Sequence, residues 1–235
     1  MKNQNNPLIE AKNLGKVYSR KNAVPIKALE GVNLEAFQGE FLAIIGRSGS
    51  GKTTLLNLLG TLDRPTTGEI KFEGKSLGGF SNRDLAILRR EKIGFIFQTF
   101  NLLPSLTVFE NVELALVHLR MSKDQIRRKV TALLDSLELA EMSSRLPLEL
   151  SVGQQQKVAI ARAIAKDPAL ILADEPTGEM DPITGREILE KLIELNRKAK
   201  ITLIVASHGR LMHEEANRTL FLKGGKIVSQ VEAGY

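Results

Sequence analysis

The sequence predicts an α/β fold with a mixed, mainly parallel sheet, an N-terminal antiparallel β subdomain and an inserted helical subdomain. Apolar runs of strand length, such as FLAIIG, LILAD and ITLIVA, alternate with segments of helical periodicity. This alternation is typical of a parallel sheet whose two faces are covered by helices. Between residues 107 and 165 the pattern is helical throughout, which indicates an insertion between sheet strands.

The first part of the chain is predicted to consist mainly of strands. Residues 8–36 predict short strands, LIEAKNLGKVY and then ALEGVNLEA, with turn glycines between them. FLAIIG, over residues 41–46, is a buried strand that runs into a glycine loop, and TTLLNLLG is the helix that follows it. The turn Pro65-Thr66-Thr67-Gly68 precedes the strand EIKFEG, and IGFIFQ, over residues 93–98, is a second buried strand.

The helical block and the closing strands follow. VFENVELALVHL and KDQIRRKVTALLDSLEL repeat apolar residues at a spacing of three to four. After Leu170 we expect the strand LILAD, the helix ITGREILEKLIELNRKA, the strand ITLIVAS and a closing hairpin, TLFLKGGKIVS. The chain is therefore interpreted as a single domain, 1–235. Residues 1–78 and 166–235 approximately form the core and β subdomain, and 79–165 the helical subdomain.

Composition limits the possible classes. The 235 residues are 43% hydrophobic, which is ordinary for a globular core. No segment approaches the ~18 apolar residues that span a bilayer, and MKNQNNPLIE lacks the apolar stretch of a signal peptide. We therefore expect a soluble chain that reaches a membrane only through a partner. The absence of cysteine excludes thiol chemistry and fits the cytosol. The net charge of +6 could suggest a polyanion partner, but the basic residues are dispersed and flanked by acids, which favours solvated helix faces.

The strand FLAIIG leads into a glycine-rich loop, GRSGSGKTT. The loop matches G-x-x-x-x-G-K-[ST] between Gly46 and Thr53, after a predicted strand and before a predicted helix. Its glycines let backbone N–H groups turn toward phosphates, and the helix start adds its positive dipole end. Lys52 should reach the β- and γ-phosphates, and the Thr53 hydroxyl should ligate magnesium. This context disfavours a chance glycine turn and predicts a P-loop NTPase core. The residues expected to bind the nucleotide here are Gly46, Ser48, Gly49, Ser50, Gly51, Lys52, Thr53 and Thr54.

Two carboxylates end the strand LILAD. Asp174 is placed where ligands bind in such sheets, at the carboxyl end of a buried strand. We expect Asp174 to hold magnesium through water, and Glu175 to act as the general base for the attacking water. The alternative is that both carboxylates are merely exposed at a strand end.

The stretch LSVGQQQKVAIARAIA, from Leu150 to Ala165, begins a helix with a serine and a glycine shortly before the acidic strand end. This arrangement predicts a nucleotide that is shared between two copies of the chain. Ser151 and Gln154 also have the spacing of a capping box. The capping role and a contact with the γ-phosphate are compatible, because both use the N-terminus of a helix.

Together these motifs resemble the ATP-binding cassette ATPases, and the resemblance covers nearly the whole chain. LSVGQ is similar to the family signature LSGGQ, and GEMD, over residues 178–181, to the loop that contacts the partner subunit. The resemblance implies that Glu175, His208 and Gln98 form the catalytic group. It further implies that Gln98, with Thr53 and Asp174, lies at the magnesium ion. Packing alone is the alternative for Tyr18, to which the resemblance gives stacking on adenine, and an ordinary loop histidine is the alternative for His208.

The resemblance also implies a closed homodimer with two ATP molecules. Ser151, Gly153 and Gln154 would face the ATP held by the partner subunit. Asp181, which stands before Pro182, would both cap a helix and contact the partner. A cap alone is the alternative for Asp181.

Three positions depart from the family pattern. Val152 replaces a glycine of the signature, and its β-branched side chain narrows the backbone choices there. Lys157 stands where arginine is usual, and Gly209 follows His208 where aspartate is usual. We expect altered tuning with retained activity, because none of the three performs the chemistry.

The segment FQTFNLLPSLTVFENVELAL is similar to one branch of the family, the ATPases of lipoprotein-releasing, macrolide-exporting and cell-division systems. This resemblance implies a four-helix permease as membrane partner and a location on the cytoplasmic, inner face of the cell membrane. A repair-type ATPase acting on nucleic acid is the alternative. We expect no nucleic-acid partner, because long coiled-coil segments and cysteine are both absent.

Overall fold

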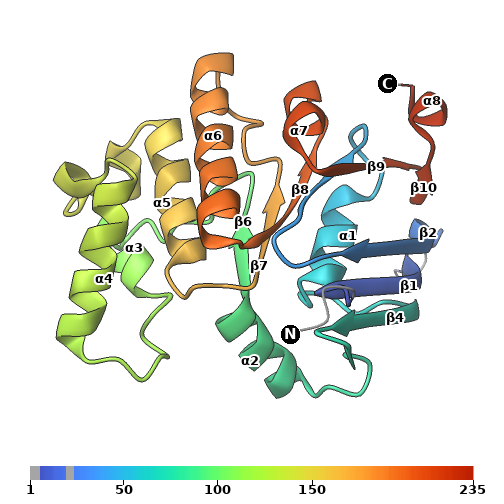
Figure 1. Cartoon of the computed structure of the whole chain (residues 1–235), viewed down its shortest axis with the longest axis horizontal. Helices are drawn as coiled ribbons and strands as arrows, with labels where there is room; N and C mark the ends of the chain where they lie inside the picture. Colours follow the sequence, from blue (N-terminus) through green and yellow to red (C-terminus); the bar gives the residue numbers. More distant parts are fainter. Residues whose placement is uncertain (1–5, 20–23, 235) are drawn as a thin grey trace.

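Two β-sheets lie on opposite sides of one helix. In the computed structural model, which describes residues 6–19 and 24–234, helix α1 (Lys52–Leu59) contacts strands of both sheets (Figure 1). The first sheet has the order β2-β1-β4-β5 with antiparallel neighbours, which confirms the expected N-terminal antiparallel sheet. Its strands are β1 (Ile9–Tyr18), β2 (Ile26–Ala36), β4 (Thr67–Phe72) and β5 (Lys75–Ser76).

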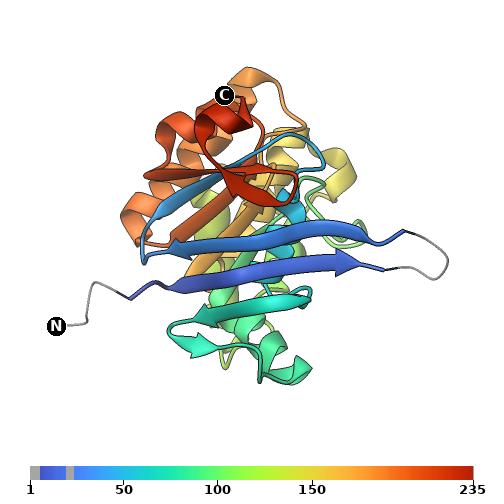
Figure 2. The ribbon, with the colours of Figure 1, turned by 90° about the vertical axis from the view of Figure 1, so that its right-hand side faces the viewer.

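Strands β1 and β2 lie where the segments LIEAKNLGKVY and ALEGVNLEA were expected to form strands, but the expectation of turn glycines between them was wrong. They have 10 and 11 residues and run side by side along most of their length (Figure 2). Gly15 lies inside β1, where a Cβ atom would collide with the side chain of Thr67. Gly31 lies inside β2 with a φ of 61°. The glycines therefore allow close strand approach and register shifts within the strands, instead of turns between them.

The second sheet has the order β10-β9-β3-β8-β7-β6, and every neighbouring pair except β10 and β9 is parallel. This confirms the predicted mixed, mainly parallel sheet and the closing hairpin. Its strands are β3 (Phe41–Ile45), β6 (Ile93–Ile96), β7 (Leu170–Asp174), β8 (Thr202–Ser207), β9 (Arg218–Lys223) and β10 (Lys226–Val228).

Helices cover the second sheet and extend away from it. They are α2 (Asn82–Lys92), α3 (Val108–Glu113), α4 (Lys123–Ser136), α5 (Val152–Ile164), α6 (Pro182–Ala199), α7 (Arg210–Glu215) and α8 (Gln230–Ala233), with short 3₁₀ turns at Ala140–Met142 and Pro147–Glu149. Helix α3 is shorter than VFENVELALVHL suggests. After Glu113 the backbone continues in tighter turns, because the N–H groups of Ala115, Leu116 and Leu119 bond to carbonyls three residues back.

The central strands are buried on both faces, which explains their continuous apolar sequence. In β3, Phe41, Ala43 and Ile45 pack into the core with α5 and α6. The alternate residues Leu42 and Ile44 pack into a second core with α1 and the antiparallel sheet. Because β3, β7 and β8 are parallel, the loops at their carboxyl ends meet at one edge of the sheet.

Helices α3, α4 and α5 pack on one another at the left of Figure 1. The boundaries 79–165 of the helical subdomain stay a prediction. Strand β6 falls inside that range and pairs with β7 in the second sheet. Within the residues that the structure describes, no helix combines the length and apolar character that crossing a membrane requires.

Candidate nucleotide site

The loop between β3 and α1 is held in an open cradle by its glycines. Gly49 and Gly51 have φ angles of 76° and 107°, in the region that favours glycine. At Gly51 a Cβ atom would also lie 2.6 Å from the carbonyl oxygen of Ala28 on β2. The start of the loop is attached to β8, because the Gly46 N–H donates to the Ser207 carbonyl at 3.2 Å. The backbone of the loop is therefore free to face a ligand.

A cleft of about 700 Å³ opens over this loop. It is lined by residues from β2, the loop, α1 and the segments that follow β6, β7 and β8. The lining residues are Ile26, Lys27, Ala28, Arg47, Ser48, Gly49, Gly51, Lys52, Thr53, Thr54, Gln98, Glu175 and His208. Of the predicted loop residues, Gly46 and Ser50 are buried below the surface of the cleft.

Lys52 is the buried cation of the cleft, with 6% of its surface exposed. Its ammonium donates to the carbonyl oxygens of Gly46 at 2.7 Å and Arg47 at 3.3 Å, and lies 3.2 Å from Oε1 of Glu175. The amine is thus fully occupied by the loop and by one carboxylate.

Asp174, the last residue of β7, is partly buried beside Thr53. Burial raises the pKa of Asp174, and a hydrogen bond with Thr53 opposes that rise. Oδ1 of Asp174 is buried and has no hydrogen-bond partner. An unpaired carboxylate oxygen beside a hydroxyl is an oxygen-donor set that suits a hard cation such as magnesium. Among the described residues, no group of three or more His, Cys, Asp or Glu side chains is arranged to hold a metal.

Glu175 has a strained backbone and two polar neighbours. Its φ of 46° is unusual for a residue with a side chain. Its Oε2 lies 2.8 Å from Nδ1 of His208, which directly follows β8 and is 64% exposed. Left-handed backbone at a side chain that lines a cleft is typical of functional sites.

Gln98 lies in the cleft two residues beyond β6, which ends at Ile96 and not at Gln98 as IGFIFQ suggested. Its Nε2 donates to Oε1 of Glu179 at 2.8 Å. Glu179 belongs to the loop between β7 and α6, so this contact joins two loops at the same sheet edge.

The predicted signature residues lie outside the cleft that the described residues form. Ser151 caps α5 and forms the capping box with Gln154, in which Gln154 N–H donates to Ser151 Oγ at 3.3 Å. At Gly153 a Cβ atom would lie 2.7 Å from Cγ2 of Thr184, so this glycine permits close contact between α5 and α6. Asp181 caps α6 by accepting from the N–H groups of Ile183 and Thr184.

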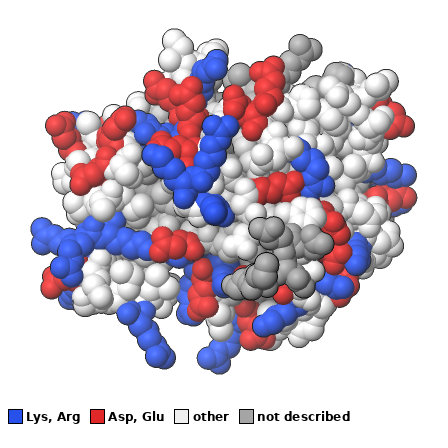
Figure 3. All heavy atoms as spheres, viewed as in Figure 1, with Lys and Arg blue, Asp and Glu red and all other residues white. Residues whose placement is uncertain are grey.

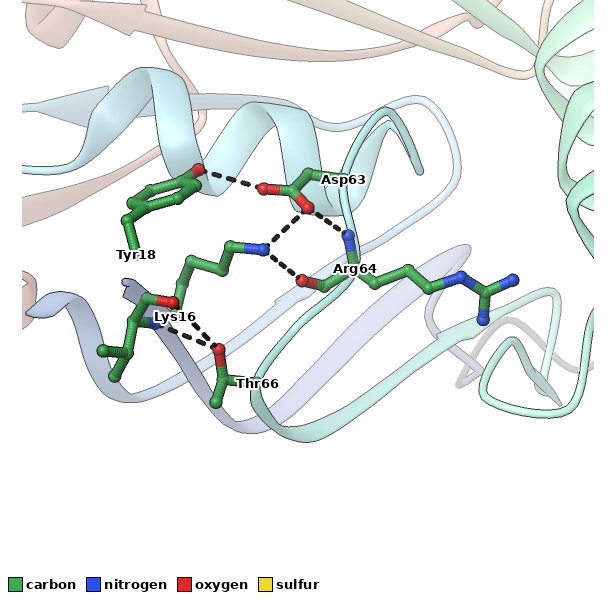
Figure 4. A network of polar contacts seen from close by, with 6 residues as sticks. Lys16, Tyr18, Asp63, Arg64 and Thr66 are labelled. Atoms are coloured by element: carbon green, nitrogen blue, oxygen red, sulfur yellow. Dashed lines mark hydrogen bonds and ion pairs between the residues drawn. The ribbon is translucent and has the colours of Figure 1, made fainter. Parts of the chain in front are cut away.

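Tyr18 ends β1 and is not among the described residues that line the cleft. Its hydroxyl donates to Oδ2 of Asp63 at 3.0 Å, and the amine of Lys16 lies 4.9 Å from its ring centroid (Figure 4). Tyr18 is paired with Ile26 on β2, and Ile26 does line the cleft. Tyr18 therefore lies beside the cleft, one strand away from it.

The three departures from the family pattern are accommodated locally. Val152 is the first residue of α5 and its side chain is exposed. Lys157 forms an ion pair with Glu138 at 2.9 Å. Gly209 is the N-cap of α7 and supplies no side-chain hydrogen bond, whereas aspartate is a favoured capping residue.

Several residues near the site were not among the predicted site residues. Arg47 and the β2 residues Ile26, Lys27 and Ala28 line the cleft, but only the strand register brings β2 there. Gln156, in α5, is fully buried and donates to the Pro176 carbonyl after β7 at 2.7 Å. The three consecutive glutamines were the sequence signal at Gln156, but they do not indicate that its side chain bonds to the segment after β7.

Arg162, also in α5, holds the segment after Gln98. Its guanidinium donates to the Asn101 and Phe100 carbonyls at 2.5 and 2.7 Å. Both of these residues have left-handed backbone, with φ angles of 49° and 60°. Helix α5, which Ser151 caps, is therefore bonded to the segments that follow both β6 and β7.

Charge on the visible face of the molecule is mixed. Figure 3 shows Lys and Arg side chains interspersed with Asp and Glu side chains on that face.

Comparisons with known proteins agree with this geometry. The family model described as ABC transporter matches residues 29–178. An uncharacterized ABC transporter ATP-binding protein of Thermotoga maritima is 45% identical over 94% of this chain and 93% of its own length. The macrolide export ATP-binding/permease protein MacB of Sodalis glossinidius is 43% identical over 95% of this chain. The match spans 34% of MacB, about a third of its length.

A solved structure is also similar. It is the dimeric, post-hydrolysis state of the ATP-binding cassette MJ0796, from Methanocaldococcus jannaschii, bound to ADP and phosphate. It superposes with a TM-score of 0.87 at 41% identity, and the match covers 94% of this chain and 97% of that one.

Proposed function

The chain belongs to the ABC transporter family of ATP-binding ATPases, and from that premise we propose that it closes around two ATP molecules as a homodimer and drives a membrane permease. The observation that carries the proposal is the separation of two sets of residues. Lys52, Glu175 and His208 line one cleft, whereas the exposed Ser151 lies outside it.

The N-terminus of α5 could bind the phosphate of a nucleotide held by a second copy of the chain. The first N–H groups of a helix have no partner within the helix, and its positive end attracts anions. Ser151 and Gly153 would present this end to the γ-phosphate held by the other copy. The MJ0796 cassette, of similar fold, is a dimer in its post-hydrolysis state, which supports the same arrangement here.

Magnesium would be held by Thr53 and Asp174, with Gln98 near it. The unpaired Oδ1 of Asp174 supports this assignment. The ion would neutralise charge on the phosphates.

The remaining side chains have roles that follow from their contacts. Lys52 would exchange the loop carbonyls for the β- and γ-phosphates. Glu175 would accept a proton from the attacking water while His208 orients the site. Catalysis would then rest on positioning and on electrostatic stabilisation, as is general for phosphoryl transfer.

We further propose a four-helix permease as the partner, at the inner face of the cell membrane. MacB, whose name joins an ATP-binding part to a permease, supports this branch. The exposed apolar side chains Leu103, Leu114 and Val117, at 41–49% exposure, offer a contact surface near the segment after Gln98. Nothing in the comparisons favours an ATPase that acts on nucleic acid.

The proposal is tested by purifying the tagged chain from solubilised membranes and identifying by mass spectrometry what remains attached. A Leu114→Glu variant, which places a charge on the apolar surface, is purified in parallel after we establish that it still hydrolyses ATP. Recovery of a four-helix permease with wild type, and its loss with the variant, would support the proposal. Recovery of only soluble or nucleic-acid partners would remove the permease and leave the ATPase.

A further inference from the structure

Asp63, which no motif includes, lies at the centre of a polar network beside the cleft. We infer that Asp63 is a positioning residue that fixes the ring of Tyr18 for contact with the base of the nucleotide. This inference rests on the proposed role of Tyr18 in binding adenine.

Three donors converge on the carboxylate of Asp63 (Figure 4). The Tyr18 hydroxyl donates to Oδ2 at 3.0 Å, whereas the Lys16 ammonium and the Arg64 N–H each donate to Oδ1 at 2.7 Å. Each carboxylate oxygen therefore has a separate task, with Oδ2 for the tyrosine and Oδ1 for the backbone and the lysine.

The network keeps Asp63 ionised. Burial acts to raise the pKa of Asp63, but the hydrogen bonds from Lys16, the Arg64 N–H and Tyr18 outweigh it and lower that pKa. The side chain of Lys16 is only 12% exposed, so its charge is paired away from bulk water. A hydrogen bond to an ionised acceptor is stronger than a neutral one, which gives the tyrosine hydroxyl a firm anchor.

The segment that carries Asp63 is itself fixed. It follows the C-terminal end of α1, where the Leu62 N–H donates to the Asn57 carbonyl at 2.8 Å. Lys16 donates to the Arg64 carbonyl at 2.7 Å, and Thr66 Oγ1 accepts from the Val17 N–H at 3.0 Å. Asp63 therefore joins the end of β1 to the far end of the helix whose first residue is Lys52.

The network also restricts which face of the ring is free. The Lys16 amine lies over the Tyr18 ring, 4.9 Å from its centroid, and so covers one face. Residues paired directly across two antiparallel strands present their side chains on the same face. Tyr18 is paired in this way with Ile26, which lines the cleft, and the ring is 39% exposed. Among the described residues, the partly exposed ring thus keeps its second face for a base.

The test compares two ligands, ATP and inorganic tripolyphosphate, each with magnesium. Tyr18→Phe keeps the ring and removes only the hydroxyl that Asp63 holds. Isothermal titration should show ATP binding weakened by about three- to tenfold, the usual effect of losing one such hydrogen bond. Tripolyphosphate, which has no base, should bind as tightly as to wild type.

Asp63→Asn should weaken ATP binding in the same selective way, and combining it with Tyr18→Phe should add little, because both remove one interaction. Glu10→Gln is the matched control, since Glu10 is also ion-paired with a lysine in the first sheet but lies away from the cleft. Equal losses for ATP and tripolyphosphate, or no loss with Tyr18→Phe, would overturn the inference. Failure of wild type to bind ATP would instead overturn the proposed function.

Discussion

Nδ1 of His208 lies 2.8 Å from one oxygen of Glu175, and the ammonium of Lys52 lies 3.2 Å from the other oxygen. The proposed general base is thus paired on both sides by groups that the γ-phosphate would also attract. Bound ATP would draw Lys52 toward the phosphates and release one oxygen of Glu175 for water. The loop, the acidic strand end and the histidine therefore act as one connected unit.

Replacing Glu175 by Gln should strongly slow ATP hydrolysis while ATP still binds. Hydrolysis should fall by about two to four orders of magnitude, the usual contribution of a general base. Because the γ-phosphate then persists, the variant with ATP and magnesium should form a closed dimer, detected by light scattering. Glu187→Gln, on the exposed face of α6, is the control and should behave as wild type. A Glu175→Gln protein that stays monomeric at high concentration would require the permease to hold the two copies together.

Ser151→Ala should lower hydrolysis and leave ATP binding to the monomer nearly unchanged, because Ser151 acts on the nucleotide of the other copy. The substitution also removes a helix cap, which costs about 1 kcal/mol of stability. Ser122→Ala is a matched control, since Ser122 and Gln125 form the same capping box at the start of α4. Both variants should lose similar stability in urea denaturation, and only Ser151→Ala should lose ATPase activity. Equal activity of the two variants would restrict Ser151 to its structural role.

The sequence pattern predicted those parts of the fold that depend on residues close together in the chain. The alternation of Leu42 and Ile44 with their neighbours reflects burial on two faces, and the loop from Gly46 to Thr53 is set by its own backbone needs. The role of the glycines in the first sheet was misjudged, because Gly15 serves the approach of β4, and that strand lies about fifty residues further along the chain.

Contacts distant in sequence explain what was missed at the site. The pairing of Tyr18 with Asp63 spans 45 residues, and that of Arg162 with Asn101 spans 61. In the sequence, nothing distinguishes Asp63 or Arg162 from the many other charged residues, which lie on the surfaces of helices and loops. Only the folded arrangement of strands and helices brings such pairs together.

Asp174→Asn should stabilise the nucleotide-free protein at neutral pH. Burial raises the pKa of Asp174 in the folded chain above 3.8, the ordinary value that applies in the unfolded chain. At a pH between the unfolded and the folded pKa, the folded chain therefore holds a proton that the unfolded chain has lost. The contribution of Asp174 to the free energy of unfolding therefore falls as the pH rises from the unfolded to the folded pKa. Above the folded pKa this loss of stability is complete. Thermal melts should show a higher Tm for the variant at pH 7.5, with the difference shrinking toward pH 4. Magnesium with ATP should reverse the order, because the ion needs the carboxylate. A variant less stable than wild type at pH 7.5 without ligand would contradict this.

Arg162→Met should loosen the segment that follows Gln98. Arg162 donates to two carbonyls, those of Phe100 and Asn101, and both residues hold left-handed backbone that costs free energy unless it is fixed by its surroundings. Methionine keeps the apolar stem and leaves both carbonyls without this donor, so unfolding in urea should require about 1–3 kcal/mol less. Hydrogen exchange in residues 98–103 should accelerate, and ATPase activity should fall because Gln98 is no longer held at the cleft.

Arg162→Lys should recover part of both properties, since one ammonium replaces a guanidinium that binds two carbonyls at once. The exposed Arg186, ion-paired with Glu190 on α6, provides the control variant Arg186→Met, which should change neither exchange nor activity. If the Arg162→Met variant lost stability but its residues 98–103 exchanged as in wild type, Arg162 would contribute to the packing of α5 without holding that segment. Faster exchange confined to that segment would instead show that Arg162 couples helix α5, which Ser151 caps, to the loop that carries Gln98.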